Sequence, residues 1–495
     1  MKPLTIVIPH SPGSFFEKTL LPLTKSILVE HVVIVSQEPV HFKMDKCRVL
    51  VAGPLPSHET LSQILAGIRT KYFLLLPEAQ QISIEPKALE RILGVAESIK
   101  AGLVYADFYN LNQLGKILHP LNDYQPGSVC DDFDFGAMIL FSVPAVRKTL
   151  KKYGIIPGVK SAGLYDLRLK VSIDHSVYHL EEPLYSVLTT DQPLGNEKIF
   201  AYVDPRNEAV QKEMETVFTD YLKKIGAYLP SSHLVHFREV EQTSKFFPVE
   251  ASVVIPVRNR KVTITEAVKS ALSQETDFPF NIIVVDNHSI DGTTAVLSDL
   301  ARQYSVIKHI VPKRTDLGDL GIGGCWNEAL HAENCGRYAV QLDSDDLYNS
   351  SRTLQKMVDM LRQGNYAMVI GSYTLVNSRL EEIPPGLIDH REWTDENGHN
   401  NALRINGLGA PRAFNTGLMR NIGFLNVSYG EDYAAALRIS RQYRIGRIYE
   451  SLYLCRRWSG NTDAALNIEE VNRNDAFKDK IRTIEILARK KINQL

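Results

Sequence analysis

The feature that most constrains the fold of this chain is an alternation of short apolar runs with segments of helical periodicity. In the second half, Ser252–Ile255, Asn281–Val285 and Tyr338–Leu342 are apolar runs bounded by turn residues, and helical patterns at about 263–273 and 293–302 lie among them. Strands that alternate with helices are typical of an α/β fold with a mostly parallel sheet. The sequence therefore predicts a Rossmann-like α/β architecture.

Each of these predicted strands is followed by a polar cluster. The clusters lie at 256–260, 286–291 and 343–346. In open parallel sheets, ligands bind outside the carboxyl ends of the strands. We therefore expect the three clusters to meet in one crevice, and we look for the functional residues there.

The first half of the chain repeats this order in weaker form. Three runs correspond, Thr5–His10 to Ser252–Val257, His31–Ser36 to Asn281–Asp286, and Lys71–Glu78 to Arg337–Ser344, and Tyr165–Arg168 is a looser counterpart of Glu431–Tyr433. Any two α/β modules share some of this pattern, but an internal duplication explains the order better. The sequence predicts two tandem modules, residues 1–245 with a linker helix at about 207–225, and residues 246–495 with a C-terminal helix.

The two predicted modules differ where chemistry is expected. The first module has Pro77–Ala79 in place of Asp343–Asp345, and Ser36 in place of Asp286. Proline and alanine carry no side-chain oxygen that could bind a cation. We therefore expect the second module to be catalytic and the first to be a degenerate, non-catalytic copy.

Composition and charge exclude several classes of protein. Lys and Arg number 56 and Asp and Glu number 57, so the net charge of -1 creates no field that would attract a nucleic-acid backbone. The five cysteines form no CxxC pair, which argues against a structural zinc site or a disulfide framework and favours a reducing compartment. The longest apolar stretch, Gly136–Val146, is well short of the roughly 18 residues of a membrane-spanning helix. We expect a cytoplasmic protein without nucleic-acid partners.

The segment from about residue 468 to the end combines Ile and Leu with Lys and Arg at helical spacing. A basic amphipathic helix of this kind packs on its own domain or lies on a membrane surface. We favour packing, and peripheral contact with the inner face of the membrane is the alternative.

Three carboxylates close the predicted strand at Leu342. Asp343, Asp345 and Asp346 repel one another, so the group is costly unless a hard cation or hydrogen-bond donors neutralise it. In an extended segment Asp343 and Asp345 point the same way, so both can approach one divalent ion. The alternative is a solvated turn in which Asp346 caps a following helix.

Two further acidic groups follow the same logic. Asp286 could accept the imide N–H of a uracil or thymine ring, or it could cap the next helix. Glu431 and Asp432 open an amphipathic helix, where the helix dipole stabilises the charged form of a carboxylate and makes it a poor acid but a dependable base. Capping is again the alternative. After the first strand, Arg258 or Arg260 could flank a nucleobase or a phosphate.

Taken together, these residues resemble the family 2 glycosyltransferases, which have the GT-A fold. The resemblance rests on four ordered elements, VIPVRNR at Val254–Arg260, VVDNHSIDGT at Val284–Thr293, LDSDD at Leu342–Asp346 and GEDY at Gly430–Tyr433. It implies that Asp343 and Asp345 bind Mn²⁺ or Mg²⁺, and that Asp432 is the catalytic base with Glu431 beside it. It also implies a nucleotide site formed by Pro256, Arg258, Asn259, Arg260, Asp286, Asp343 and Ser344.

The same resemblance assigns the acceptor or donor-sugar contacts to Asn415, Thr416, Arg457 and Trp458. The sequence departs from the family in two places, since Arg258 replaces a common aromatic residue and Trp458 replaces a common histidine that would be a third metal ligand. Arg457 and Trp458 also resemble the QxxRW element of processive synthases, but Leu454 occupies the glutamine position. Single addition is therefore expected rather than processive synthesis.

The implied activity is an inverting, metal-dependent transfer of a hexosyl or N-acetylhexosaminyl group. The donor would be a nucleotide sugar, UDP-linked, and the acceptor a hydroxyl of a glycan or a lipid-linked molecule in surface polysaccharide or glycoconjugate synthesis. Two alternatives stay open. One is a nucleotide-sugar-binding pseudoenzyme or scaffold of a glycan-assembly complex. The other is a nucleotidyltransferase, which should carry a Gly-rich, Lys-containing signature near the first strand, where Pro256–Lys261 has no glycine.

Overall fold

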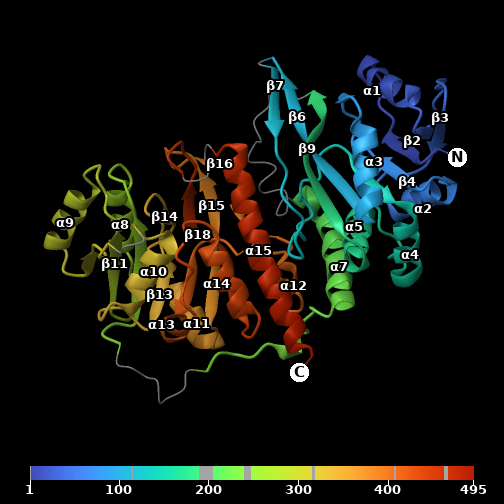
Figure 1. Cartoon of the computed structure of the whole chain (residues 1–495). Helices are drawn as coiled ribbons and strands as arrows, with labels where there is room; N and C mark the ends of the chain where they lie inside the picture. Colours follow the sequence, from blue (N-terminus) through green and yellow to red (C-terminus); the bar gives the residue numbers. More distant parts are fainter. Residues whose placement is uncertain are drawn as a thin grey trace. The chain divides into compact units, whose positions relative to one another are not determined.

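The chain forms two compact units, each built around its own sheet (Figure 1). The computed structural model describes residues 2–113, 115–188, 205–238, 247–314, 318–405, 408–461 and 466–494. The first unit comprises Met1–Gly195, Arg206–Tyr228 and Leu466–Leu495, and the second comprises Asn196–Pro205 and Leu229–Ala465. The predicted boundary at 245–246 lies outside the described residues.

The second unit contains a nine-stranded sheet in the order β12-β11-β10-β13-β17-β15-β18-β14, with β16 paired to β15. The strands are β10 (Ala251–Val257), β11 (Phe280–Asp286), β12 (Ile307–Ile310), β13 (Tyr338–Gln341), β14 (Leu347–Tyr348), β15 (Met368–Val376), β16 (Glu382–Ile388), β17 (Arg412–Asn415) and β18 (Ile445–Arg456). Strands β10 to β13 are parallel, whereas β17 runs antiparallel to both β13 and β15. The sheet is therefore mixed, and its parallel half carries the predicted strand ends.

The helices of the second unit cover this sheet. They are α8 (Ile264–Leu272), α9 (Thr293–Gln303), α10 (Ile322–His331), α11 (Thr353–Gly364), α12 (Gly398–Asn401), α13 (Thr416–Ile422) and α14 (Glu431–Ser440), with a short 3-10 turn η2 at Ser231–His233. In α8 the buried residues Ile264, Ala267, Val268 and Ala271 form one helical face and belong to the same core as Val253 and Ile282 of the sheet. Strands covered in this way are apolar on both faces, which is why β10 and β11 read as continuous apolar runs in the sequence.

The first unit has a sheet of the same size in the order β3-β2-β1-β4-β8-β6-β9-β5, with β7 paired to β6. Its strands are β1 (Leu4–Pro9), β2 (Val29–Ser36), β3 (Cys47–Val51), β4 (Tyr72–Leu75), β5 (Ile82–Ile84), β6 (Leu103–Asn112), β7 (Gly115–His119), β8 (Ile139–Ser142) and β9 (Val177–Leu188). Its helices are α1 (Ser14–Lys25), α2 (His58–Gly67), α3 (Ala88–Ile99), α4 (Val143–Tyr153), α5 (Gly163–Asp174), α7 (Glu208–Ile225) and α15 (Ile468–Ile492), and the 3-10 turn η1 (Pro205–Asn207) precedes α7.

The two sheets have the same topology, since adding nine to each strand number of the first order gives the second. Equivalent hydrogen bonds fix the correspondence residue by residue. The N–H of Leu76 donates to the carbonyl of Val7, as that of Leu342 donates to Val254. The expectation of two tandem GT-A-like modules, each α/β with a largely parallel sheet, is confirmed.

The residue equivalence near the predicted base differs from the one read off the sequence. The hydroxyls of Tyr165 and Tyr433 each donate to a backbone carbonyl at 2.6 Å, and both tyrosines precede the next strand, β9 or β18, by the same interval. Tyr165 therefore corresponds to Tyr433, and Leu164 to the predicted base Asp432. The neighbouring Asp166 is buried in ion pairs with His58 and Lys170 instead.

The C-terminal helix α15 belongs to the first unit and not, as the sequence analysis expected, to the second. The hydroxyl of Ser128 donates to Asp479 at 2.7 Å, and the N–H of Gly127 donates to Thr483 Oγ1 at 2.8 Å. A Cβ atom on Gly127 would lie 2.0 Å from the carbonyl oxygen of Asp479, so the loop and the helix backbone are in direct contact. The sequence analysis favoured packing of this helix on its own domain, the second module, whereas the helix packs on the first.

Within the described residues, no helix combines the length and the apolar character needed to cross a membrane.

Candidate functional site

The carboxyl ends of β10, β11 and β13 meet, as the sequence predicts. Asn259, after β10, donates its N–H to Ser289 Oγ at 2.9 Å, and its side-chain oxygen accepts the N–H of Ile290 at 2.8 Å. Asn259 has a φ of 54°, in the left-handed region that asparagine tolerates well. The hydroxyl of Thr263, just before α8, donates to the carbonyl of Ser344 at 3.0 Å. These contacts hold the three polar clusters at one edge of the sheet.

Asp345 lies at the centre of this edge and is contacted by two other predicted segments. Its Oδ2 accepts the indole N–H of Trp458 at 3.1 Å and the amide of Asn461 at 3.3 Å. The Nε of Arg260 lies 3.7 Å from the same oxygen. The turn after β18 and the loop after β10 therefore both reach one carboxylate.

The two neighbouring carboxylates have different partners. Both oxygens of Asp343 face the side-chain amide of Gln341, at 3.0 and 3.1 Å, and the N–H of Asp343 donates to the hydroxyl of Tyr453 at 2.9 Å. Asp346 is buried, and its Oδ1 accepts the N–H of Arg456 at 2.7 Å. Because β14 follows directly, Asp346 caps no helix and instead ties the end of β13 to the end of β18.

Burial and the neighbouring carboxylates destabilise the charged forms of Asp343 and Asp346. Burial and the charge of Asp345 raise the pKa of Asp343, although the hydrogen bond from Gln341 opposes this. Burial, followed by the charges of Asp343 and Asp345, raises the pKa of Asp346 well above its ordinary value. A hard divalent cation would remove this repulsion, and carboxylate oxygens are the ligands such cations prefer. The residues present therefore fit Mn²⁺ or Mg²⁺, and of the three carboxylates Asp343 and Asp345 are the partly exposed ones.

Glu431 and Asp432 begin α14. The side chain of Asp432 is 34% exposed, its Oδ2 lies 2.7 Å from Arg412 Nη2, and its Oδ1 accepts the N–H of Tyr433 at 2.6 Å. Glu431 is 8% exposed, and its Oε2 has no hydrogen-bond partner within the described part of the chain. Burial and the charge of Asp432 raise the pKa of Glu431 to about 8. At neutral pH Glu431 is therefore mostly protonated, and Asp432 is the more exposed member of the pair.

Sequence reasoning missed the residues that join these two acidic groups. Arg412 donates to Gln341 Oε1 at 2.9 Å as well as to Asp432, and Gln341 donates to Asp343. A glutamine in the otherwise apolar run of β13 is the one signal that could have identified this connection, because a buried polar side chain needs partners.

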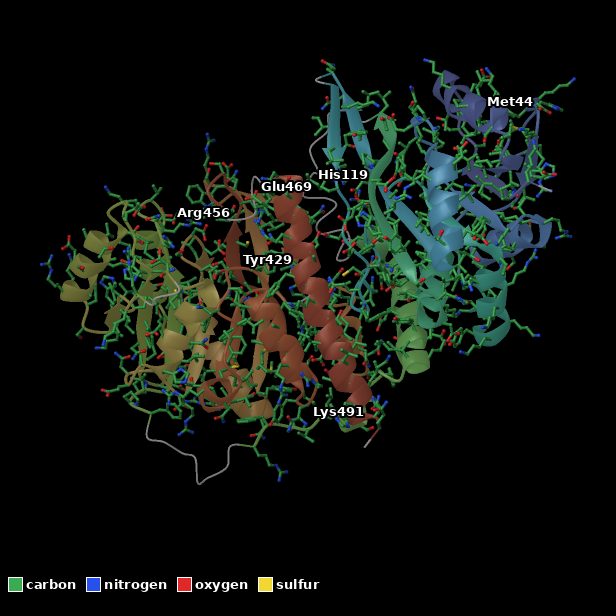
Figure 2. All side chains as sticks on the ribbon, viewed as in Figure 1. Met44, His119, Tyr429, Arg456, Glu469 and Lys491 are labelled. Atoms are coloured by element: carbon green, nitrogen blue, oxygen red, sulfur yellow. The ribbon has the colours of Figure 1, made fainter. Side chains whose placement is uncertain are left out.

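Arg456 is a second residue that the sequence analysis left without a role. It ends β18, where Figure 2 labels it, and its guanidinium donates to Glu266 of α8 at 2.6 Å. Since its backbone also bonds Asp346, this residue fixes the end of β18, after which the turn with Trp458 follows.

Comparison with known proteins assigns the domain that contains this edge. Residues 252–421 match the family model described as Glycosyl transferase family 2. The second half of this chain contains a family 2 glycosyltransferase domain. The match ends before Glu431 and Asp432, so their roles depend on the geometry described above.

The curated relatives resemble parts of this chain. An uncharacterized glycosyltransferase of Rickettsia conorii is 26% identical over 48% of this chain and 39% of its own length. An uncharacterized protein of Mycobacterium bovis is 26% identical over 22% of this chain and 31% of its own length. The chain thus spans well under half the length of these relatives.

Two solved structures align with part of this chain at low TM-scores. S. aureus TarS 1-349 in complex with UDP-GlcNAc aligns with 48% of this chain and 72% of its own, with 22% identity and a TM-score of 0.36. Mannosyltransferase PcManGT from Pyrobaculum calidifontis, in complex with GDP-Man and Mn²⁺, aligns with 59% of this chain and 83% of its own, with 15% identity and a TM-score of 0.33.

In the glycosyltransferase domain, Asp286 is completely buried and bonds to its own turn. It accepts the N–H of Ser289 at 3.0 Å and the hydroxyl of Thr294 at 2.5 Å, and His309 Nε2 lies 3.5 Å away. Burial alone would raise the pKa of Asp286, but these contacts outweigh it and hold the pKa well below the ordinary value. Asp286 does not cap the following helix, because α9 has Gly292 as its N-cap and no side-chain cap hydrogen bond; it ties the turn after β11 together instead. Recognition of a nucleobase by this carboxylate stays a prediction.

The other residues predicted to bind the nucleotide lie along the same edge of the glycosyltransferase domain. Arg258 is half exposed and pairs with Asp319 at 2.7 Å, so a ligand would compete with that carboxylate for the guanidinium. Pro256 pairs with Val285 in the parallel ladder between β10 and β11, and it is partly exposed.

The structure does not bring Asn415 and Thr416 to this edge of the domain, so their predicted sugar or acceptor contacts are not supported. Asn415 pairs with Tyr338, at the amino end of β13, roughly 16 Å of extended chain from Asp343. Its side chain caps α13, and the hydroxyl of Thr416 donates to the carbonyl of Gly336 at 2.7 Å. The antiparallel direction of β17 places its end at the opposite edge of the sheet.

Trp458 does reach the carboxylates of the glycosyltransferase domain, through its bond to Asp345. The N–H of the preceding residue, Arg457, donates to the carbonyl of Val376 at 2.7 Å and extends the pairing of β18 with β15. The predicted contacts of both residues with sugar or acceptor stay predictions.

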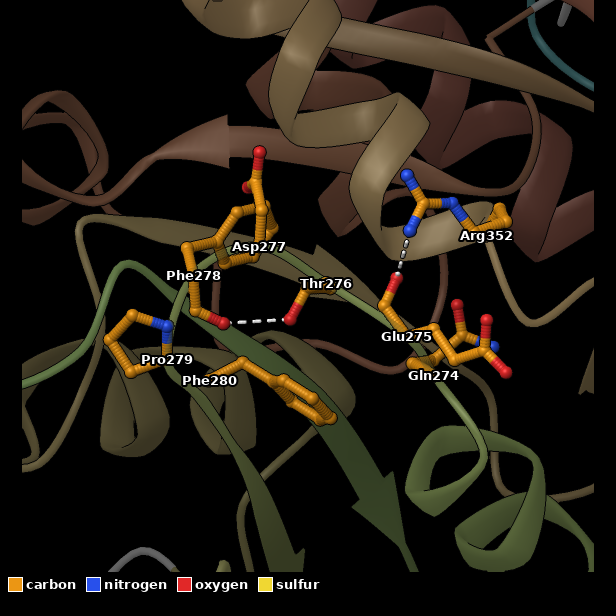
Figure 3. A pocket seen from close by; sticks show the side chains of 8 residues that line it. All are labelled: Gln274, Glu275, Thr276, Asp277, Phe278, Pro279, Phe280 and Arg352. Carbon is orange, nitrogen blue, oxygen red and sulfur yellow. Dashed lines mark hydrogen bonds between the residues drawn. The ribbon is translucent and has the colours of Figure 1, made fainter.

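A cavity of about 620 Å³ lies at the other end of β11 (Figure 3). It is lined by 274–280 and Arg352, which donates to the carbonyl of Glu275 at 3.2 Å. Since β11 begins at Phe280 and ends at Asp286, the cavity and the carboxylates lie at opposite edges of the sheet. The cavity is therefore separate from the candidate active site.

Proposed function

We propose that the second module is an inverting, metal-dependent glycosyltransferase. It would transfer a hexosyl or N-acetylhexosaminyl group from a UDP-linked sugar to a hydroxyl of a glycan or lipid-linked acceptor. The observation that supports this most is that hydrogen bonds join two acidic groups in a domain of this family. One group is Asp343 with Asp345, the other is Asp432, and Gln341 and Arg412 connect them. One group suits the diphosphate end of a donor, and the other suits an acceptor hydroxyl.

In this mechanism Asp432 removes the proton from the acceptor hydroxyl. The acceptor oxygen forms a bond to the anomeric carbon while the bond from that carbon to the diphosphate breaks on the opposite face, so the configuration inverts. Asp343 and Asp345 would hold Mn²⁺ or Mg²⁺, which would supply charge neutralisation for the leaving diphosphate. Arg260, near Asp345, adds a positive charge at the same end. Glu431, which burial keeps protonated, places no second negative charge beside the base.

The first module is proposed to be non-catalytic. By the shared topology, Pro77 and Ala79 occupy the positions of Asp343 and Asp345, and Leu164 occupies that of Asp432. A module without these oxygens can support the second module, bind acceptor glycan or contact a partner, but it cannot hold a metal-bound donor in the same way.

The cellular role of the second module depends on the acceptor that it uses. We propose synthesis of surface polysaccharide or glycoconjugate, in the cytoplasm or at the inner face of the membrane. Fractionation of cells that express the tagged chain, with and without high salt, tests the place of action.

The test of the reaction is release of free nucleoside diphosphate from a panel of UDP- and GDP-linked sugars with Mn²⁺. A glycosyltransferase releases the diphosphate slowly even with water as acceptor, a pseudoenzyme or scaffold releases none, and a nucleotidyltransferase liberates pyrophosphate. Asp432→Asn should keep donor binding and lose transfer by roughly two to four powers of ten, because only proton removal in the transition state is affected. Transfer by this variant at the wild-type rate would exclude Asp432 as the base, and Glu333→Gln, at an exposed glutamate of the same unit, is the control.

A further inference from the structure

Arg412 lies between the two acidic groups of the candidate site. It is the first residue of β17, and only 11% of its side chain is exposed. Its guanidinium donates to three acceptors, the carbonyl of Leu408, Gln341 Oε1 at 2.9 Å and Asp432 Oδ2, which lies 2.7 Å from Nη2. A guanidinium presents donors in a fixed planar fork, so these contacts orient all three acceptors at once.

The connection continues to the predicted metal ligands. The amide nitrogen of Gln341 lies 3.0 and 3.1 Å from the two oxygens of Asp343. The partners fix which way the amide faces, because the reverse orientation would set its NH₂ against the guanidinium and its oxygen against a carboxylate. Asp343, Gln341, Arg412 and Asp432 thus form an unbroken series of hydrogen bonds, which we call the Arg412 network.

The Arg412 network places a positive charge beside Asp432, which the proposed base needs because other acidic side chains lie near it. Asp432 is near Glu431 and Asp343, whose pKa values its charge helps to raise. A carboxylate that is one-third exposed at the start of a helix can also adopt several rotamers. Arg412 supplies both a counter-charge and a fixed partner for one of its two oxygens.

The first module shows that the fold does not depend on this network. In the first module, Leu75 occupies the position equivalent to Gln341, and Ile139 the position equivalent to Arg412. This follows from the strand registers, because β8 pairs with β4 as β17 pairs with β13. Pro77 and Leu164 take the places of Asp343 and Asp432. All four positions are apolar in a module that keeps the same sheet order, so the four polar residues occur together only where the acidic groups are present.

We propose that Arg412 is a positioning residue that orients Asp432 and, through Gln341, couples the base to the donor-binding carboxylate Asp343. The inference rests on the proposed function in taking Asp432 as the base. A cation bound by Asp343 would compete with the Gln341 amide for the same oxygens. The hydrogen bonds from Gln341 to Arg412 and from Arg412 to Asp432 carry that change to the base, 89 positions along the chain from Asp343.

The test uses the full chain with Arg412→Lys, which keeps the charge and removes the fork, and Gln341→Leu, which copies Leu75. Turnover is measured as UDP release from the UDP-sugar that the panel identifies, and UDP binding with Mn²⁺ is measured by calorimetry. Arg420→Lys is the matched control, since Arg420 lies on α13 in the same unit and bonds the carbonyl of Leu330.

We expect Arg412→Lys to lower kcat by roughly tenfold or more, with KM for the donor and Kd for UDP changed by less than about threefold. Gln341→Leu should lower kcat less, and the double variant should lose little beyond Arg412→Lys, because both changes interrupt one series of bonds. Unchanged kcat in Arg412→Lys would overturn the Arg412 proposal, and so would an equal loss of kcat, UDP affinity and unfolding midpoint. In either case, turnover by the wild-type chain would still support the proposed glycosyltransferase activity. If the wild-type chain neither binds UDP nor releases it from any donor, the proposed function and the Arg412 proposal both fall.

Discussion

Burial of Glu431 should make the stability of the second unit depend on pH. The structure leaves its Oε2 without a hydrogen-bond partner among the described residues, and burial with the adjacent Asp432 raises its pKa from 4.5 to about 8. The folded state therefore holds a proton that the unfolded state releases above about pH 5. Because the folded state binds more protons in this window, raising the pH destabilises it, and the loss levels off near pH 8.

Glu431→Gln removes this titration and keeps the shape of the side chain. One pH unit corresponds to roughly 1.4 kcal/mol, so the stability of the variant relative to wild type should rise by about 3 kcal/mol between pH 5 and pH 8. Local relaxation and water would reduce this value. The sign is fixed, since the variant gains on the wild type as pH increases.

Urea unfolding followed by tryptophan fluorescence measures this difference. The three tryptophans, Trp326, Trp393 and Trp458, all lie in the second unit, so the signal reports on that unit. Glu333→Gln is the control and should differ from wild type by no more than about 0.5 kcal/mol at any pH, as expected of an exposed position. A flat difference between Glu431→Gln and wild type from pH 5 to pH 8 would refute the argument that burial keeps Glu431 protonated.

Three further outcomes are expected. Chelation should abolish UDP release, and Asp345→Ala should weaken UDP binding with Mn²⁺ but barely change it without metal; calorimetry that shows equal losses in both conditions would exclude Asp345 as a ligand. The same method should give one Mn²⁺-dependent UDP site per chain, and a second site surviving in Asp343→Asn/Asp345→Asn would show that the first module also binds donor. Gly127→Val should destabilise the first unit by roughly 2–4 kcal/mol in scanning calorimetry, because its Cβ would lie 2.0 Å from the backbone of α15. The control is Gly94→Ala in α3, which should be neutral or stabilising because nothing lies within 4 Å of the added Cβ. An equal response of the two variants would contradict the packing of α15.

The sequence alone determined the elements and the edge where the site lies. The helix predicted at 263–273 is α8 (Ile264–Leu272), the one at 293–302 is α9 (Thr293–Gln303), and the linker helix at 207–225 is α7 (Glu208–Ile225). These elements are set by local periodicity and turn chemistry, which a sequence displays directly. The meeting of the clusters after β10, β11 and β13 was predictable too, because parallel strands bring their carboxyl ends to one edge.

Only the tertiary structure decided the direction of β17 in the sheet and the surface on which α15 packs. Because β17 inserts antiparallel beside β13, its first residue, Arg412, reaches Gln341, while its last residue, Asn415, lies at the opposite edge. The sequence analysis had instead assigned ligand contacts to Asn415 and none to Arg412. Likewise α15 packs in the first unit through Asp479 and Thr483, although it follows the second in the chain. Periodicity shows that a helix has a face to bury, whereas the surface that covers it depends on shape and on polar partners hundreds of residues away, which only the folded chain brings together.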